Sequence, residues 1–102
     1  MINKMVNIAV LGNDEFIVGF QLAGIKDIIQ ATNNPFNDIQ EIKKRKDIGI
    51  VVLDEKIVQA LDASQKQEIE NSVEPVFITL STKAEQESLK KLIKKSIGIE
   101  LW

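Results

Sequence analysis

Four short apolar segments recur along the chain, and each is followed by a stretch with helical features. The segments are rich in β-branched residues and cover Val6 to Leu11, Asp27 to Ala31, Ile48 to Leu53 and Val76 to Leu80. Strands that alternate with helices are typical of a parallel sheet with helices on its faces. The pattern therefore predicts an α/β fold with a four-stranded parallel sheet.

The apolar content of the segments also predicts their places in the sheet. "VNIAVL" and "IGIVVL" are nearly continuous apolar runs, as expected of central strands that are covered on both faces. "DIIQA" is shorter and more polar, which fits an edge strand. We expect the strand order 2-1-3-4, a Rossmann-like or receiver-like arrangement with flanking helices, followed by a C-terminal amphipathic helix.

Polar residues before the helical stretches predict where the helices begin. Asn13 or Asp14 can cap the first helix, Asn34 with Pro35 the second, and Asp54 the third. The third helix is expected to break after Asp62 and to restart with a capping box over Ser64 to Gln67. Thr82 and Glu85 predict a capping box for the last helix, which we expect to end before Gly98.

The last helix is predicted to be amphipathic. Its apolar positions are Leu89, Leu92, Ile93 and Ile97, and its lysines at 90, 91, 94 and 95 are expected on the other side, with Glu87 placed to pair with Lys91. Such a helix can pack on the sheet, dock on a partner helix or lie on a membrane, and the narrow stripe makes the membrane interpretation the weakest. We expect a globular domain over residues 1–80 and a C-terminal helix and tail over 81–102, with a joint at Leu80 to Lys83. Trp102 is a candidate interface anchor.

Composition narrows the classes of function. The chain has 102 residues, enough for one core, and contains no cysteine and no histidine, which removes the commonest metal ligands and general base. A net charge of −2 gives no reason to expect nucleic acid, and no apolar run approaches the ~20 residues needed to cross a bilayer. We expect no cofactor and no direct membrane insertion. The first residues merge into a strand pattern without a small-residue cleavage site, so no secretory signal is expected.

Three carboxylates offer an alternative chemistry at the carboxyl ends of the strands. In the order 2-1-3-4, strands one and three are adjacent, so Asp14, Glu15 and Asp54 could converge on a hard cation such as magnesium. A response-regulator receiver uses a similar cluster, with Asp54 in the place of the phosphoacceptor. The helix dipole also favours acidic residues in the first turn of a helix and explains these positions without a metal.

The stretch "IVGFQLAGI", Ile17 to Ile25, places glycines at 19 and 24 in or beside the first helix. A helix-interior glycine costs roughly 0.5–1 kcal/mol relative to alanine, so something is expected to approach this backbone closely. We expect Gly19 and Gly24 to bring the first helix close to strands one and three, with Phe20 and Ala23 inward. The opposite face would be left for a partner.

Four motifs in order resemble one known family over nearly the full length of the chain. They are "GFQLAGI" seven positions after Gly12, "DIGIVVLDE" from Asp47, "PVFITLSTK" from Pro75, and "LKKLIKKSIGIEL" from Leu89. Together they resemble the F subunit of the archaeal-type (A/V-type) rotary ATPases. Gln21 departs from the arginine common in that family's first motif.

The resemblance implies a non-catalytic subunit of the central stalk, peripheral on the cytoplasmic face of the membrane. Its expected partners are the coiled-coil axle, which is the D subunit, and, through the C-terminal helix, the catalytic-head subunits A and B. That helix is expected to move between retracted and extended positions and to modulate coupling. The candidate partner-binding residues are Gly19, Phe20, Gln21, Leu22, Gly24, Leu89, Leu92, Ile93, Ile97 and Trp102. A receiver-like signalling domain using Asp54 and a stand-alone adaptor are the alternatives.

Overall fold

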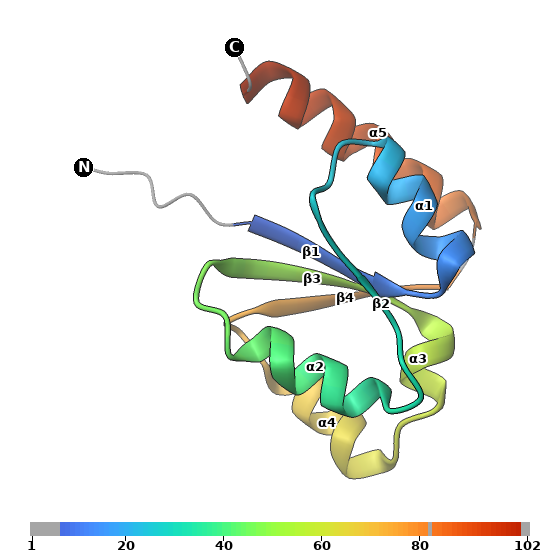
Figure 1. Ribbon diagram of the computed structural model, residues 1–102, viewed down its shortest axis with the longest axis vertical. Helices are drawn as coiled ribbons and strands as arrows, with labels where there is room; N and C mark the ends of the chain where they lie inside the picture. The colour runs from blue at the N-terminus through green and yellow to red at the C-terminus, as the bar shows by residue number, and fades with distance from the viewer. Residues whose placement is uncertain (1–6, 82, 101–102) are drawn as a thin grey trace.

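Four parallel strands form one sheet in the order β2-β1-β3-β4 (Figure 1). The computed structural model describes the backbone of residues 7–81 and 83–100 and the side chains of residues 7–81 and 83–93. The strands are β1 (Asn7–Gly12), β2 (Asp27–Gln30), β3 (Ile48–Asp54) and β4 (Val76–Leu80). The predicted fold class and strand order are confirmed.

The strand bounds lie within one residue of the predicted ones. β1 and β3 each extend one residue further, to Gly12 and Asp54, and Val6 lies outside the described residues. β2 ends at Gln30 rather than Ala31, although the Ala31 N–H still donates to the Gly12 carbonyl at 2.9 Å. Strand ends that differ by one residue are expected where the ladder continues into a loop.

Five helices of the described chain cover the two faces of the sheet. They are α1 (Asp14–Leu22), α2 (Pro35–Lys43), α3 (Glu55–Gln59), α4 (Ala63–Asn71) and α5 (Lys83–Glu100). In Figure 1, α1 and α5 lie on one face, and α2, α3 and α4 lie on the other. A parallel sheet needs this double cover because both faces of its central strands are apolar.

Each face of the sheet has its own apolar core. On the α2–α4 face, Ala9, Leu11, Val51 and Leu53 pack against residues such as Ile39, Ile42, Ile57, Leu61 and Ile69. On the α1–α5 face, Val10, Val52 and Leu80 pack against Phe16 and Phe20 of α1 and Ile93 of α5. Alternate residues of β1 and β3 enter opposite cores, because side chains of a strand point alternately to its two faces.

The predicted N-caps of the first three helices are largely confirmed. Asn13, rather than Asp14, caps α1, and its Oδ1 accepts a hydrogen bond from the Phe16 N–H at 3.0 Å. Asn34 caps α2 with Pro35 in the first turn, and Asp54 Oδ1 accepts from the Lys56 N–H at 3.1 Å to cap α3. These short polar side chains satisfy backbone donors that the first helical turn leaves unpaired.

The predicted start of α4 was wrong by two residues. The capping box joins Asp62 and Gln65: Asp62 Oδ1 accepts from the Gln65 N–H at 2.8 Å, and Gln65 Oε1 accepts from the Asp62 N–H at 3.1 Å. Asp62 has the extended backbone that an N-cap requires, whereas Ser64 already lies inside the helix. A break between two helices was therefore predicted correctly, but it begins after Gln59 rather than after Asp62, and its capping residues differ.

The predicted end of α5 was also wrong. The helix continues through Gly98 to Glu100. A glycine ends a helix when it takes a left-handed conformation, and a helical glycine merely lowers the local helix propensity. At the start of α5, Glu85 accepts hydrogen bonds from the Ser81 N–H at 2.8 Å and the Ser81 hydroxyl at 3.0 Å, while Thr82 lies outside the described residues.

Candidate partner-binding surface

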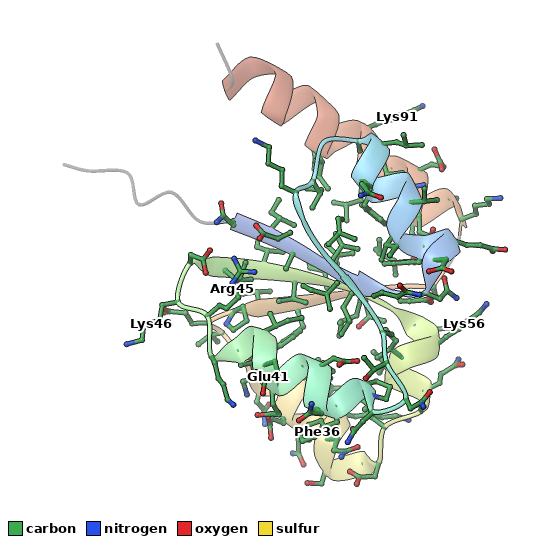
Figure 2. All side chains as sticks on the ribbon, in the orientation of Figure 1. Phe36, Glu41, Arg45, Lys46, Lys56 and Lys91 are labelled. Atoms are coloured by element: carbon green, nitrogen blue, oxygen red, sulfur yellow. The ribbon has the colours of Figure 1, made fainter. Side chains whose placement is uncertain are left out.

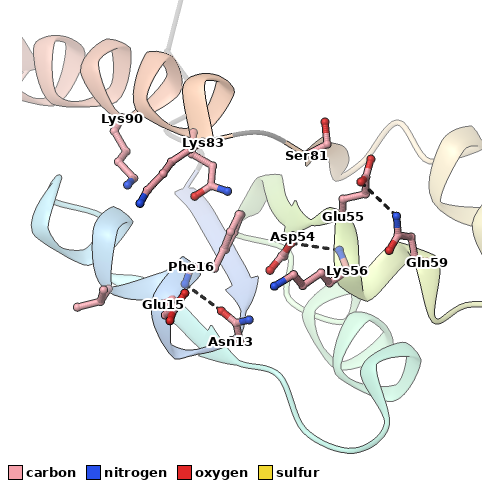
Figure 3. A pocket seen from close by; sticks show the side chains of 12 residues that line it. Asn13, Glu15, Phe16, Asp54, Glu55, Lys56, Gln59, Ser81, Lys83 and Lys90 are labelled. Carbon is pink, nitrogen blue, oxygen red and sulfur yellow. Dashed lines mark hydrogen bonds between the residues drawn. The ribbon is translucent and has the colours of Figure 1, made fainter.

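An open cleft of about 660 Å³ lies at the carboxyl ends of β1, β3 and β4 (Figure 3). Its walls carry charges of both signs, from Glu15, Asp54, Lys56, Lys83 and Lys90. Folds of this type often bind ligands at this edge, so the predicted carboxylate cluster would lie in this cleft. Asp14, however, is not among the residues that line it.

The three carboxylates do not form a cation site. Across residues 7–81 and 83–93, no three acidic side chains gather closely enough to hold a metal ion. Asp54 is 8% exposed and its carboxylate is used as the cap of α3, as Figure 3 shows by the dashed line to Lys56. The Asp54 carboxylate serves the backbone of α3 and Asp14 lies outside the cleft, so the structure does not bring the three carboxylates together.

The outer face of α1 is exposed and includes two of the candidate partner-binding residues, Gln21 and Leu22. Phe20 and Ala23 are buried, as expected, while Gln21 is exposed and Leu22 is 80% exposed. Val18, one helical turn before Leu22, is also exposed. Val18, Gln21 and Leu22 are called the α1 surface below.

Gly24 does not pack the helix on the sheet, contrary to expectation. α1 ends at Leu22, and Gly24 lies beyond it with a φ of 107°. The Ile25 N–H donates to the Phe20 carbonyl at 3.2 Å, and the Gly24 N–H donates to the Gln21 carbonyl at 3.1 Å. This is a Schellman motif, in which glycine is favoured because the left-handed position disfavours a side chain.

Gly19 allows a close approach, but the approaching group is Lys90 of α5 rather than the sheet. A Cβ on Gly19 would lie 2.7 Å from Lys90 Cε and would overlap the ammonium group. The expected contact of Gly19 with strands one and three is therefore wrong. Sequence patterns could not reveal this contact, because the two residues belong to helices at opposite ends of the chain.

The inner face of α5 differs from the predicted apolar stripe. Ile93 is buried and Leu89 half-buried, as predicted, but Leu92 is 61% exposed and Lys90 turns inward. Glu87 pairs with Lys90 at 3.0 Å, not with Lys91. Lysine tolerates this position because its aliphatic stem packs on apolar groups. The side chains of Ile97 and Trp102 lie outside the described residues.

A shallow groove of about 200 Å³ separates α1 from α5. It is lined by Gly19, Leu22 and Ala23 on one side and by Glu87, Lys90 and Lys91 on the other. The Lys90 ammonium group lowers the pKa of Glu87 by donating a hydrogen bond to its carboxylate, so this side of the groove holds a close ion pair. The α1 surface therefore borders a groove with a charged wall.

Three basic residues before β3 make ion pairs. Lys43 contacts Glu68 of α4 at 2.9 Å, Lys44 contacts Glu41 at 3.0 Å, and Arg45 contacts Asp27 and Asp47 at 3.0 and 2.8 Å. The labelled side chains in Figure 2 place Arg45 at the amino ends of the strands. The Lys43–Glu68 pair connects α2 to α4, and the Arg45 pairs connect the loop before β3 to Asp27 of β2 and to Asp47.

Four parallel strands covered by helices on both faces (Figure 1), with Leu22 of α1 and Leu92 of α5 exposed, define an α/β domain of the parallel-sheet class. None of the described helices combines the length and apolar character that a bilayer crossing requires.

Residues 8–97 match the family described as ATP synthase (F/14-kDa) subunit. The F subunit of the A-type ATP synthase of Archaeoglobus fulgidus is 33% identical over 100 residues, covering 96% of this chain and 99% of the relative. That of Methanocorpusculum labreanum is 40% identical over 100 residues, with 95% and 99% covered. The chain belongs to this family of ATP synthase F subunits, which are non-catalytic members of the complex.

A solved structure agrees with this assignment. The crystal structure of the V-type ATP synthase F subunit from Archaeoglobus fulgidus matches with a TM-score of 0.64 and 32% sequence identity. The match covers 74% of this chain and 96% of the solved one. The parallel sheet with its flanking helices is therefore shared with an F subunit of known structure.

Proposed function

We propose that this chain is a rotor subunit of the central stalk, which binds the coiled-coil axle, the D subunit, and helps couple ATP synthesis or hydrolysis to ion translocation. Membership of the F-subunit family supports a place for this chain within an ATP synthase complex. The observation that carries the binding role is the α1 surface, where Val18 and Leu22 are exposed one helical turn apart. An exposed apolar stripe with this spacing fits against another helix.

The structure divides the ten candidate partner-binding residues into three groups. Gln21, Leu22, Gly24 and Leu92 are exposed and available to a partner. Phe20 and Ile93 are buried, Leu89 is half-buried and Gly19 is covered by Lys90, so these four support the surface from within while α5 is docked. Ile97 and Trp102 stay predictions.

We assign the contact with the catalytic-head subunits A and B to α5. Figure 1 shows the C-terminal half of this helix running past the end of α1, away from the sheet. Leu92 adds an exposed apolar side chain to the helix. In this proposal, residues 1–80 stay bound to the axle while residues 81–102 move about the joint at Leu80 to Lys83. The whole assembly is peripheral at the cytoplasmic face of the membrane.

Co-purification from native cells tests the proposal. The chain is tagged at its N-terminus, expressed in its own cells and recovered from detergent-solubilised membranes, and its companions are identified by mass spectrometry. We expect the coiled-coil axle together with subunits A and B. Recovery of a kinase in their place would support the receiver alternative with Asp54, and recovery of the chain alone would contradict the stalk role.

Direct binding to the axle needs a second experiment, because co-purification also reports indirect contacts. The purified axle is mixed with the purified chain, and the mass of the product is measured by light scattering after size exclusion. A 1:1 complex is expected. Failure to form it, with both proteins folded, would place the chain elsewhere in the complex.

A further inference from the structure

The Gly19 notch is the gap that the missing side chain of Gly19 leaves on the α5 side of α1. The α1 backbone at this point is approached by Lys90, whose Cε would lie 2.7 Å from any Cβ at residue 19. Glycine inside a helix is unfavourable for the helix itself. The flexible end of the Lys90 side chain occupies the space that a side chain at residue 19 would take.

Lys90 makes two further contacts from this notch. Its ammonium nitrogen lies 5.4 Å from the centroid of the Phe20 ring, and it donates to Glu87 Oε2 at 3.0 Å. The Lys90 side chain is only 19% exposed, while that of Glu87 is 56% exposed. The Phe20 ring is fully buried, so the cation lies over an aromatic face with one side shielded from water. These three interactions, with Gly19, Phe20 and Glu87, are called the Lys90 contact.

The chemistry of the Lys90 contact suits a reversible attachment. Ile93 and Leu89 bury apolar surface against the sheet, and separating them from it exposes that surface to water. An ammonium group has the opposite preference, because water solvates it well once it leaves the notch. A helix held partly by such a group can separate without leaving an unsatisfied buried charge behind.

We propose that the Lys90 contact holds α5 against α1 and sets how often the two helices separate. The notch accepts a lysine stem, the ring of Phe20 attracts its charge, and Glu87 limits its rotation. Separation exposes the Phe20 edge of α1 beside Leu22, so the contact also controls how much of α1 a partner can reach. This second consequence rests on the proposed axle-binding function, whereas the attachment of α5 does not.

Distance measurement between the two helices tests the proposal on the full chain in the absence of partners. The sequence contains no cysteine, so Gln21→Cys on α1 and Ser88→Cys on α5 can be spin-labelled without removing native thiols. Both positions are exposed. Pulsed electron resonance then gives the populations of docked and separated α5.

Lys90→Gln removes the charge and shortens the side chain, and Lys91→Gln is its matched control on the exposed neighbouring lysine. We expect the ratio of separated to docked α5 to rise about 3- to 30-fold in Lys90→Gln relative to Lys91→Gln, the range of a cation–π interaction. Equal ratios in these two variants would overturn the proposal.

Gly19→Ala perturbs the Lys90 contact from the α1 side. Alanine favours the helix itself, but its Cβ pushes Lys90 out of the notch. We expect more separated α5 with no loss in hydrogen-exchange protection of β1 and β3, a combination that general destabilisation would not produce. Docked α5 in Gly19→Ala, with an unchanged distance distribution, would overturn the proposal. Failure of the proposed function has a different signature: the wild-type chain would not bind the axle, whatever the distances show.

Discussion

The ring of Phe16 lies directly against the backbone of Gly12, with no space for a side chain between them. A Cβ on Gly12 would lie 2.9 Å from both Cβ and Cγ of Phe16 and would overlap the ring edge. Gly12 ends β1, and Phe16 is in the first turn of α1 and buried in the core. The turn between β1 and α1 is therefore too tight to accommodate a side chain at residue 12.

Gly12→Ala is expected to lower the free energy of unfolding by about 1–3 kcal/mol, because the buried Phe16 ring has to shift within a packed core. Urea denaturation measures the loss. Gly12→Ala combined with Phe16→Leu should lose less stability than the sum of the two single variants, since the two residues are in contact and their effects do not add. Full stability of Gly12→Ala alone would mean that the ring moves freely.

Asp62→Ala is expected to lower the free energy of unfolding by about 0.5–2 kcal/mol, the usual effect of losing an N-cap. Ser64→Ala is the matched control, because Ser64 is exposed and lies inside α4 rather than at its cap. Thermal or urea unfolding compares the two. A larger loss in Ser64→Ala would restore the capping box first predicted from the sequence.

Asp47 is expected to make stability depend on pH. The Arg45 guanidinium, and to a smaller degree the Asn7 amide, hold the pKa of Asp47 below its ordinary 3.8. Because the folded-state pKa is lowered, the stabilisation is present above about pH 3.8 and is lost as pH falls through the folded-state value. The stability difference between wild type and Asp47→Asn should therefore be constant from about pH 7 to about pH 5 and shrink below about pH 4. A difference that stays constant to about pH 3 in urea unfolding would contradict the pairing.

Leu22→Gln is expected to weaken binding to the axle while leaving the stability of the chain unchanged, because the side chain is 80% exposed. We expect Leu22 to act as an anchor of the interface, and losing an anchor costs more than about 1 kcal/mol, so the dissociation constant should rise about fivefold or more. Val73→Gln is the matched control: Val73 is 82% exposed and lies after α4, remote from the α1 surface. Calorimetry compares the two, and equal affinities would contradict the role of Leu22 as an anchor for the axle.

The sequence predicted the sheet because its signals are local and redundant. The unbroken apolar runs of β1 and β3 need cover on both faces, which makes them central, and the polar β2 belongs at an edge. The caps at Asn34 and Asp54 act on backbone groups two or three residues away, so they too can be recognised along the chain. Where two such signals competed, at Asp62 and Ser64, the backbone conformation decided between them.

Which side chains are exposed on α1 and α5 depends on the tertiary structure. The lysines of the last helix suggested a solvated face, yet the space left by Gly19 and the ring of Phe20 draw Lys90 inward, and Leu92 is exposed in turn. The sequence by itself determined the α/β class, the strand order and the family resemblance, since these depend on local patterning and short motifs. Which side chains face a partner depended on contacts between helices at opposite ends of the chain, and no local pattern carries that information.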